Sequence, residues 1–246
     1  MKKFAVFTLI LIFTCGQAFA STLTVALFDL SGSVFVDNSG SEGKESPYNR
    51  NMSDLKKEIN RLNKGDTMII IGFGRKSDVT LLKASMPRQG GPGNQNLIAT
   101  RQAAVKKLEE NMASKAKSVD NTRTDIIGSL FRASRLIEEF EDPESPDKQG
   151  KRLLIYSDML DNENAGLSFN RLKDGSYKKF LKGIENKKIG YPNLKNVEVN
   201  IYSAFSDIKD ISTVETEVAI KNLKSFWTDY LSRKCGSNIK SYRTNY

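Results

Sequence analysis

Five short apolar runs, separated by segments with helical spacing, constrain the fold of this chain more than any other feature. Most of the runs are apolar on both faces, which is typical of strands in a sheet that helices cover on both sides. Their alternation with helices predicts an α/β domain with a Rossmann-like, doubly wound and mostly parallel sheet. The runs are LTVALF at 23–28, TMIIIGFG at 67–74, DVTLLKASM at 78–86, RLLIYSDM at 152–159 and VEVNIYSAF at 197–205.

The segments between these runs repeat apolar residues at the period of a helix. We expect 78–86 at an edge of the sheet, and we expect Gly236 to end the closing helix. No sixth strand is evident, so the sequence predicts one domain over 21–236 and a C-terminal tail over 237–246. The predicted helices are 53–63, 97–117, a segment opened by 121–125, SYKKFLKGIEN and 213–234.

Residues 1–20 have the layout of a signal peptide. Lys2 and Lys3 precede the apolar run FAVFTLILIF, and an A-x-A cleavage site follows. The run is too short to span a bilayer as a mature helix, and no later stretch predicts a transmembrane segment. We therefore expect an exported protein of the bacterial periplasm or cell surface that starts near Ser21. A lipoprotein anchored through Cys15 is the alternative.

The composition excludes several classes of site. The chain has no histidine, which rules out Ser-His-Asp and Cys-His catalysis, so oxygen ligands must hold any metal. Cys235 is the only cysteine after the leader, and it is either a buried thiol or a partner for another protein's thiol. The net charge of +9 is spread over several segments without an aromatic-interleaved basic run, so we expect no binding of nucleic acid.

Oxygen-bearing side chains follow two of the predicted strands at the point where each strand ends. Asp29, Ser31 and Ser33 alternate after the first strand, and Asp158 ends the fourth. Ligands of such folds bind at the carboxyl ends of the strands, so the two carboxylates meet there if the strands are neighbours. Thr124, between a loop and a helix, adds a further hydroxyl. Carboxylate and hydroxyl oxygens suit Mg²⁺, with Mn²⁺ or Ca²⁺ as alternatives.

This pattern resembles the von Willebrand factor type A (VWA) domain. DLSGS after a strand, a threonine before a helix and a strand that ends in SD match its metal-ion-dependent adhesion site. The resemblance covers about residues 22–234 and implies a binding module for another protein, whose acidic side chain completes the metal's coordination. It also implies the metal ligands, which are Asp29, Ser31, Ser33, Thr124 and Asp158.

Two positions depart from the family pattern or leave it open. Met159 stands where the family usually has glycine, which weakens the assignment of Asp158 most. Thr122 competes with Thr124 for the threonine position, and we favour Thr124 because TDIIGSL leads directly into the helix.

Other polar residues near these loops have simpler interpretations. The DLSGS stretch alone also fits an ordinary turn in which serine hydroxyls satisfy backbone groups. Asp125 could support the metal ligands from behind, but we expect it instead to stabilise a helix N-terminus, where negative charge is favourable. Asp161, Glu163 and Asn164 lack the calcium-loop pattern of an EF-hand, and we expect a solvated loop there.

The leading functional hypothesis is an exported, metal-dependent protein-binding module that is not an enzyme. The first alternative is a metal-assisted phosphohydrolase with Asp29 as its nucleophile. Such enzymes need a second aspartate two residues later as general acid, where this chain has Ser31. The second alternative is a structural subunit in which the site holds no metal.

Overall fold

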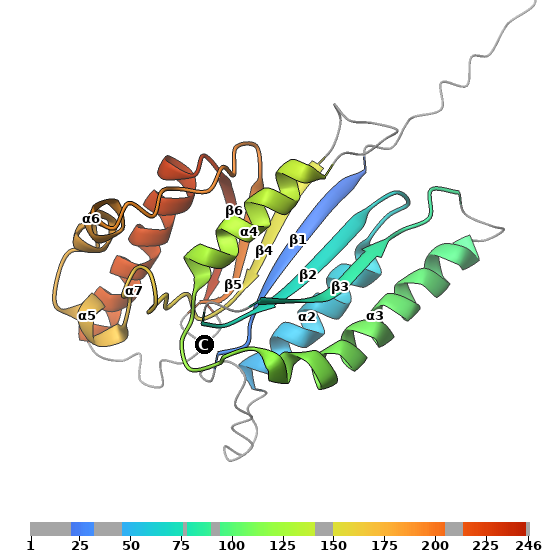
Figure 1. The fold of residues 1–246 in the computed structure, drawn as a ribbon, viewed down its shortest axis with the longest axis horizontal. Helices are drawn as coiled ribbons and strands as arrows, with labels where there is room; N and C mark the ends of the chain where they lie inside the picture. The colour runs from blue at the N-terminus through green and yellow to red at the C-terminus, as the bar shows by residue number, and fades with distance from the viewer. Residues whose placement is uncertain are drawn as a thin grey trace, which may run out of the picture.

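The computed structural model contains one six-stranded sheet, in the order β3-β2-β1-β4-β5-β6 (Figure 1). The structure describes residues 21–31, 46–75, 78–89, 94–140, 150–204 and 214–244. The strands are β1 (Thr22–Asp29), β2 (Thr67–Phe73), β3 (Asp78–Ser85), β4 (Gly150–Tyr156), β5 (Glu198–Ala204) and β6 (Asn238–Thr244). The predicted signal peptide lies outside the described residues.

Pairing in the sheet is parallel except at one edge. The central strand β1 pairs in parallel with β2 on one side and with β4 on the other. Strand β3 pairs antiparallel with β2 and forms an edge. The predicted fold class, a Rossmann-like and mostly parallel sheet, is confirmed. These strands could be predicted from their continuous apolar runs because they are buried on both faces. Every residue of β2 and the last four residues of β4 are buried.

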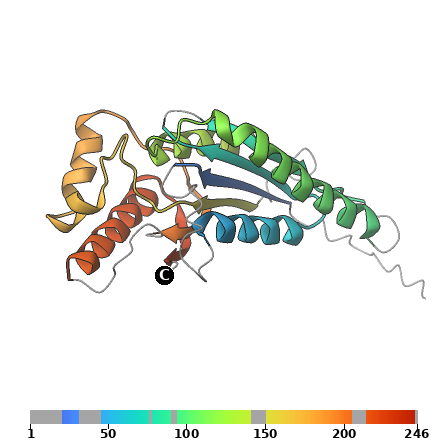
Figure 2. The same ribbon diagram turned by 90° about the horizontal axis from the view of Figure 1, so that it is seen from below.

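Helices cover both faces of this sheet (Figures 1 and 2). Helices α2 and α3 contribute to the hydrophobic core on one face, and α4 to α7 contribute to the core on the other. The helices are α2 (Pro47–Arg61), α3 (Gln95–Lys115), α4 (Ile126–Glu139), α5 (Phe169–Lys173), α6 (Lys178–Asn186) and α7 (Val214–Thr228), with short 3₁₀ and π turns at η2 (Ala116–Ser118) and η4 (Asp229–Lys234). In the part of the chain that the structure describes, no helix has the length and hydrophobicity of a membrane span.

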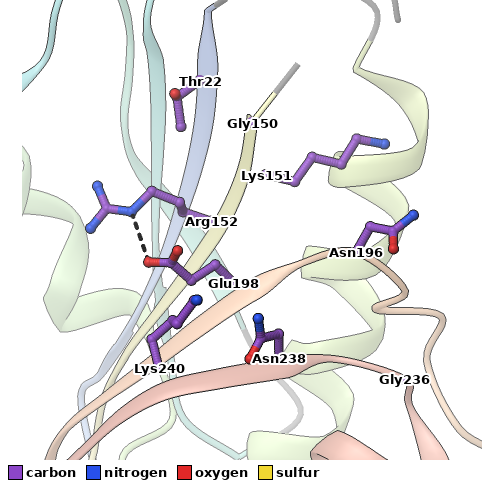
Figure 3. Close-up of a pocket in the computed structure, with 9 residues that line it drawn as sticks. All are labelled: Thr22, Gly150, Lys151, Arg152, Asn196, Glu198, Gly236, Asn238 and Lys240. Atoms are coloured by element: carbon purple, nitrogen blue, oxygen red, sulfur yellow. Dashed lines mark ion pairs between the residues drawn. The ribbon is translucent and has the colours of Figure 1, made fainter. Parts of the chain in front are cut away.

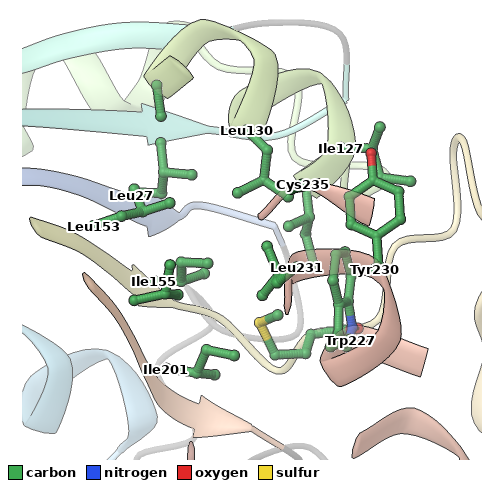
Figure 4. Packing of buried hydrophobic residues seen from close by; sticks show 14 of the residues in the cluster. Leu27, Ile127, Leu130, Leu153, Ile155, Ile201, Trp227, Tyr230, Leu231 and Cys235 are labelled. Carbon is green, nitrogen blue, oxygen red and sulfur yellow. The ribbon is translucent and has the colours of Figure 1, made fainter. Parts of the chain in front are cut away.

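The last helical segment packs tightly onto the sheet. Trp227 and Tyr230 are fully buried with Leu231 against Ile155 and Ile201 (Figure 4). Cys235 is also buried in this cluster, which agrees with the interpretation as a buried thiol. Burial raises the pKa of the Cys235 thiol to about 12, so it is protonated at neutral pH.

A sixth strand corrects the prediction of a C-terminal tail. Residues 238–244 pair in parallel with β5, so the sheet continues beyond Gly236. No described side chain of this strand is fully buried, and it carries Lys240 and Arg243. A strand at a sheet edge with exposed polar residues lacks the continuous apolar run of the other strands, and the sequence pattern therefore missed it.

Candidate metal centre

The carboxyl ends of β1 and β4 bring Asp29 and Asp158 to the same edge of the sheet. The two strands are parallel neighbours in register, with Phe28 opposite Tyr156. Asp29 is the last residue of β1, and Ser157 and Asp158 follow β4 directly. The Ser157 hydroxyl donates to Asp29 Oδ2 at 2.6 Å, so the two loops are in direct contact. The sequence pattern indicates no role for Ser157, although the SD pair that contains it is part of the motif.

Asp29 is a fully buried carboxylate held by neutral groups. Besides the Ser157 hydroxyl, the Ser31 backbone N–H donates to its Oδ1 at 2.8 Å. Burial raises the pKa of Asp29, and hydrogen bonds from Ser157 and Ser31 oppose this shift. Desolvation of a carboxylate is costly unless an opposite charge offsets it. A cation at this edge would supply that charge.

The residue after Asp158 is Met159, where the resemblance in sequence leads us to expect glycine. Met159 adopts the left-handed conformation that favours glycine, with φ at 68°. Its side chain is buried in the core, and its carbonyl accepts a hydrogen bond from Trp227 Nε1 at 2.8 Å. Asp158 itself is buried, and its Oδ1 accepts from the Leu160 N–H at 2.9 Å. The packing of Met159 thus offsets the backbone strain, which costs about 1 to 2 kcal/mol.

Backbone hydrogen bonds hold Thr124 beside the loop that follows Asp158. The Thr124 N–H donates to Asn162 Oδ1 at 3.0 Å, and the Thr124 carbonyl accepts from the Glu163 N–H at 3.3 Å. Next to it, the Asp125 N–H donates to the carbonyl of Gly74, at the end of β2. Thr124 therefore belongs to a third loop, and hydrogen bonds connect this loop to the carboxyl ends of its neighbours.

Thr122, the competing threonine, lies differently. It is exposed, and its N–H and hydroxyl both donate to Asp120 Oδ1 at 3.0 and 2.7 Å. Thr124 is 3 % exposed. The burial and the loop contacts thus favour Thr124 for the threonine position.

Asp161 corrects the expectation of a solvated loop after β4. Its carboxylate is fully buried and accepts backbone N–H bonds from Ile127, Asn164 and Ala165, all within 2.9 Å. Burial raises its pKa to about 6. Asp161 therefore clamps the loop after β4 to the start of α4, a role that no local sequence signal indicates because it depends on tertiary contacts.

Asp125 caps α4, as the sequence predicts. Its Oδ1 accepts from the Gly128 N–H at 2.7 Å and from Asn164 Nδ2 at 2.6 Å. The cap thus also fastens the loop that contains Asp161 to the helix.

The donor set at this edge fits a hard divalent cation. Asp29, Ser31 and Asp158 lie at the ends of adjacent strands, at the carboxyl edge of the sheet, which we call the rim. The Thr124 loop is attached to the same rim. Ser33 lies outside the described residues. Within the described ranges, no cluster of three or more Asp, Glu, Cys or His side chains could bind a metal. Two carboxylates would therefore need hydroxyl oxygens to complete a site, which is compatible with Mg²⁺.

Comparisons with known proteins bear on the fold alone. No protein-family model and no curated protein matches the sequence. The D319A mutant of the PilB minor pilin from Streptococcus sanguinis matches with a TM-score of 0.51 and 15% identity over 93% of this chain and 58% of that chain. BatB from Bacteroides thetaiotaomicron matches with a TM-score of 0.45 and 13% identity over 92% of each chain. The SpRpn10 VWA domain matches with a TM-score of 0.40 and 12% identity over 92% and 89%.

The match with the PilB minor pilin mutant supports the fold alone, a mostly parallel sheet flanked by helices. At these identities the similarity carries no residue roles to this chain. The case for a metal centre in this chain rests on the burial and hydrogen bonds of Asp29, Ser31, Thr124 and Asp158.

Proposed function

We propose that this chain is an exported, metal-dependent protein-binding module rather than an enzyme. The observation that carries the proposal is that Asp29 and Asp158 lie at the same edge of the sheet, where the hydroxyl of Ser157, the residue before Asp158, donates to Asp29. The proposed ligands of the cation, some of them acting through water, are Asp29, Ser31, Ser33, Thr124 and Asp158.

The proposed ion is Mg²⁺, with Mn²⁺ or Ca²⁺ as substitutes. Such a hard cation prefers oxygen ligands and leaves coordination positions for a carboxylate of the partner protein. The chain's own residues pre-organise the rim, because hydrogen bonds from Ser31 and Ser157 fix the Asp29 carboxylate before any ligand arrives. The hydroxyl ligands add no negative charge. If Asp158 acts through water, the ion has one direct carboxylate and would keep part of its positive charge, which attracts an acidic side chain.

Export is supported by the N-terminal sequence alone. Residues 1–20 combine two lysines, an apolar run and an A-x-A cleavage site. Detection of a mature N-terminus near Ser21 in the periplasm or at the cell surface would test this part of the proposal.

The test of the metal site is calorimetric titration with Mg²⁺ and Mn²⁺. We expect Asp29→Ala to abolish binding of both ions, because it removes a buried carboxylate at the centre of the rim. Melting curves in EDTA show whether the variant still folds. Unchanged uptake of either ion by a folded Asp29→Ala protein would refute the proposal.

A matched pair of threonine variants tests the same site without removing a charge. Thr124→Val should weaken Mn²⁺ binding about tenfold, because it replaces a buried ligand hydroxyl with a methyl group of similar size. Thr122→Val serves as the control, because the Thr122 hydroxyl bonds to Asp120 at the surface. Equal affinities in the two variants would argue against Thr124 as a ligand.

The proposed partner is a protein that presents an acidic side chain to the bound ion. Short peptides that each contain one glutamate should bind the protein in Mn²⁺ and lose binding in EDTA. Their glutamine counterparts provide the control, since they keep the shape but lack the charge. Binding that persists in EDTA would favour the alternative of a structural subunit whose site holds no metal.

A further inference from the structure

The net charge of this protein is concentrated in one short segment. Residues 171–190 contain seven Lys or Arg and two Asp or Glu, so they carry +5 of the chain's net charge of +9. The predicted signal peptide contributes another +2 through Lys2 and Lys3. The rest of the chain therefore has a net charge of only +2. Such a distribution creates a local positive potential, beyond what solubility alone would need.

This segment includes all of α6 and the end of α5, which lie at one end of the molecule beside α7 (Figures 1 and 2). Asn222 of α7 donates through Nδ2 to the carbonyls of Leu172 and Gly175, both at 2.8 Å. The Tyr177 hydroxyl donates to Asp229 Oδ2 at 2.8 Å. These contacts fix α5 and α6 against α7.

Three lysines lie together on the exposed side of α6. The opposite side of this helix belongs to the hydrophobic core and carries Phe180, Leu181 and Ile184. The lysines are exposed, and their spacing of three and four residues places them on one side of the helix. We call this surface the lysine face, and it consists of Lys178, Lys179 and Lys182.

The lysine face lowers the stability of its own helix. Lys178 and Lys182 are four residues apart, and like charges at this spacing repel each other. Lys178 and Lys179 are also the first two residues of α6, where positive charge opposes the helix dipole. The first turn has no acidic residue, and the Tyr177 side chain does not cap it. A negative charge beside this end of α6 would offset these costs.

The acidic side chains nearby leave the lysine face unpaired. Glu185 of α6 pairs with Lys234 at 2.9 Å, and Glu215 of α7 pairs with Lys173 at 3.0 Å. Asp174 is the other acidic residue of the segment. In the ranges that the structure describes, none of the three lysines forms an ion pair with it or with any other carboxylate.

The positive surface continues onto α5. The Arg171 guanidinium and the Lys179 ammonium lie 5.3 and 5.1 Å from the centre of the Phe180 ring. Cation–π attraction holds both groups near this buried ring, although both side chains are exposed. Arg171 also donates to the Gly166 carbonyl at 2.8 Å. The lysine face thus has a fourth positive group beside it.

The positive side chains at the amino edge of the sheet are arranged differently. They surround a polar hollow of about 570 Å³ where the parallel strands begin (Figure 3). Lys151 and Lys240 point away from each other there, and Arg152 pairs with Glu198 at 3.8 Å. These groups do not form one surface of unpaired charge, in contrast to the lysine face.

We propose that the lysine face binds the surface of a membrane that contains anionic phospholipids. The headgroups of such a membrane present many negative charges side by side, and each ammonium group near them strengthens binding severalfold. Because the apolar side chains of α6 belong to the core, the helix adsorbs through its charge and does not insert. The binding is therefore reversible and sensitive to salt.

The composition of this surface favours a membrane over an acidic protein. Protein interfaces are depleted in lysine and contain a desolvated apolar or aromatic centre. Among the described residues, the exposed large apolar side chains are those of Ile98, Val214 and Val218, and none of them belongs to α5 or α6. Lysine ammonium groups are strongly hydrated, and at a layer of headgroups they remain so.

The test measures binding to lipid vesicles by co-sedimentation. The protein is used without residues 1–20, because the apolar run there would bind lipid by itself, and every described helix and strand lies after residue 20. The vesicles contain phosphatidylglycerol, which is anionic, or phosphatidylcholine, which has no net charge. Soluble polyglutamate represents an acidic protein. EDTA is present throughout, so the results do not depend on the metal centre.

Two triple variants test the position of the charge. The first removes the lysine face by the substitutions Lys178→Gln/Lys179→Gln/Lys182→Gln. The second removes the same charge from exposed positions on α3, on the other side of the sheet, by the substitutions Lys106→Gln/Lys107→Gln/Lys115→Gln.

We expect the unmodified protein to bind phosphatidylglycerol vesicles, with a loss of at least about tenfold in the lysine-face variant and at most about twofold in the α3 variant. Phosphatidylcholine vesicles should not bind, and salt at about 0.5 M should release the protein. The proposal is refuted if phosphatidylglycerol does not bind or if both variants lose binding equally. Binding of polyglutamate without binding of vesicles would also refute it and would assign the face to an acidic protein.

Thermal unfolding without lipid separates binding from a structural role of these lysines. We expect the lysine-face variant to be at least as stable as the unmodified protein, because the substitutions relieve repulsion at the start of α6. A lower melting temperature than that of the α3 variant would show that the lysines support the fold, which contradicts the proposal.

Discussion

The two edges of the sheet differ in the sign of their charge and in its exposure to solvent. At the carboxyl edge, Asp29, Asp158 and Asp161 are almost completely buried, and hydrogen bonds fix their oxygens. At the amino edge, Lys240 and Asn238 are exposed around an open hollow. The same parallel strands therefore carry concentrated, constrained negative charge at one end and solvated positive charge at the other.

The difference shows where tertiary structure controls chemistry in this fold. Buried carboxylates depend on neighbouring backbone groups for their stability, so changes there should affect both folding and binding. Exposed ammonium groups remain hydrated, so changes at the amino edge should leave folding almost unchanged. Substitutions at each edge can test this contrast.

Loss of the Asp161 carboxylate should have the largest effect on stability. Asp161→Ala leaves three buried backbone N–H groups without their acceptor, and we expect the free energy of unfolding to fall by about 4 kcal/mol. Asn238→Ala at the amino edge should change it by less than about 0.5 kcal/mol. Urea denaturation of both variants measures the change in the free energy of unfolding. Similar changes in the two variants would contradict the difference between the two edges.

The pH dependence of stability should reveal the same carboxylate. The pKa of Asp161 is raised by burial from 3.8 to about 6, so between these pH values the folded state binds more protons than the unfolded state. Its contribution to stability therefore falls as pH rises through this window, by up to about 3 kcal/mol, and then stays constant.

Asp161→Asn removes this titration. The unfolding free energy of the unmodified protein minus that of the variant should decrease between pH 4 and pH 7 when both are measured in EDTA. A difference that stays constant or increases over this range would contradict the assignment.

A smaller effect should follow from removing the anchor of Met159. Trp227→Phe deletes the donor to the Met159 carbonyl, and we expect a loss of about 1 to 2 kcal/mol together with weaker Mn²⁺ binding. Tyr230→Phe, three residues later, is the control. Within the described part of the chain, the buried Tyr230 hydroxyl has no hydrogen-bond partner, so its removal should not destabilise the protein. Equal losses in thermal and urea unfolding would show that the Trp227 hydrogen bond is unimportant.

The sequence was sufficient to predict the parts of the fold that depend on local pattern. Apolar runs identified β1 to β5, and the rule for parallel sheets predicted that Asp29 and Asp158 share an edge. The helix cap at Asp125 was likewise readable, because it depends on residues within one turn.

Features that depend on distant contacts could not be predicted in this way. The burial of Asp161 results from backbone groups of α4 and of its own loop, and the contact between Ser157 and Asp29 joins residues 128 positions apart. Strand β6 was missed because its exposed side chains resemble those of a loop. Met159 could not be predicted either. Its left-handed backbone conformation is unusual for methionine, and burial of its side chain in the core holds it there.

The position of β6 in the chain has a consequence for biogenesis. This strand follows α7, and its pairing with β5 cannot form until residues 238–244 have left the ribosome or crossed a membrane pore. During synthesis or translocation, β5 remains an edge strand with unsatisfied backbone groups that can pair with another polypeptide. A chaperone that shields this transient edge would therefore raise the yield of native protein without changing its final stability.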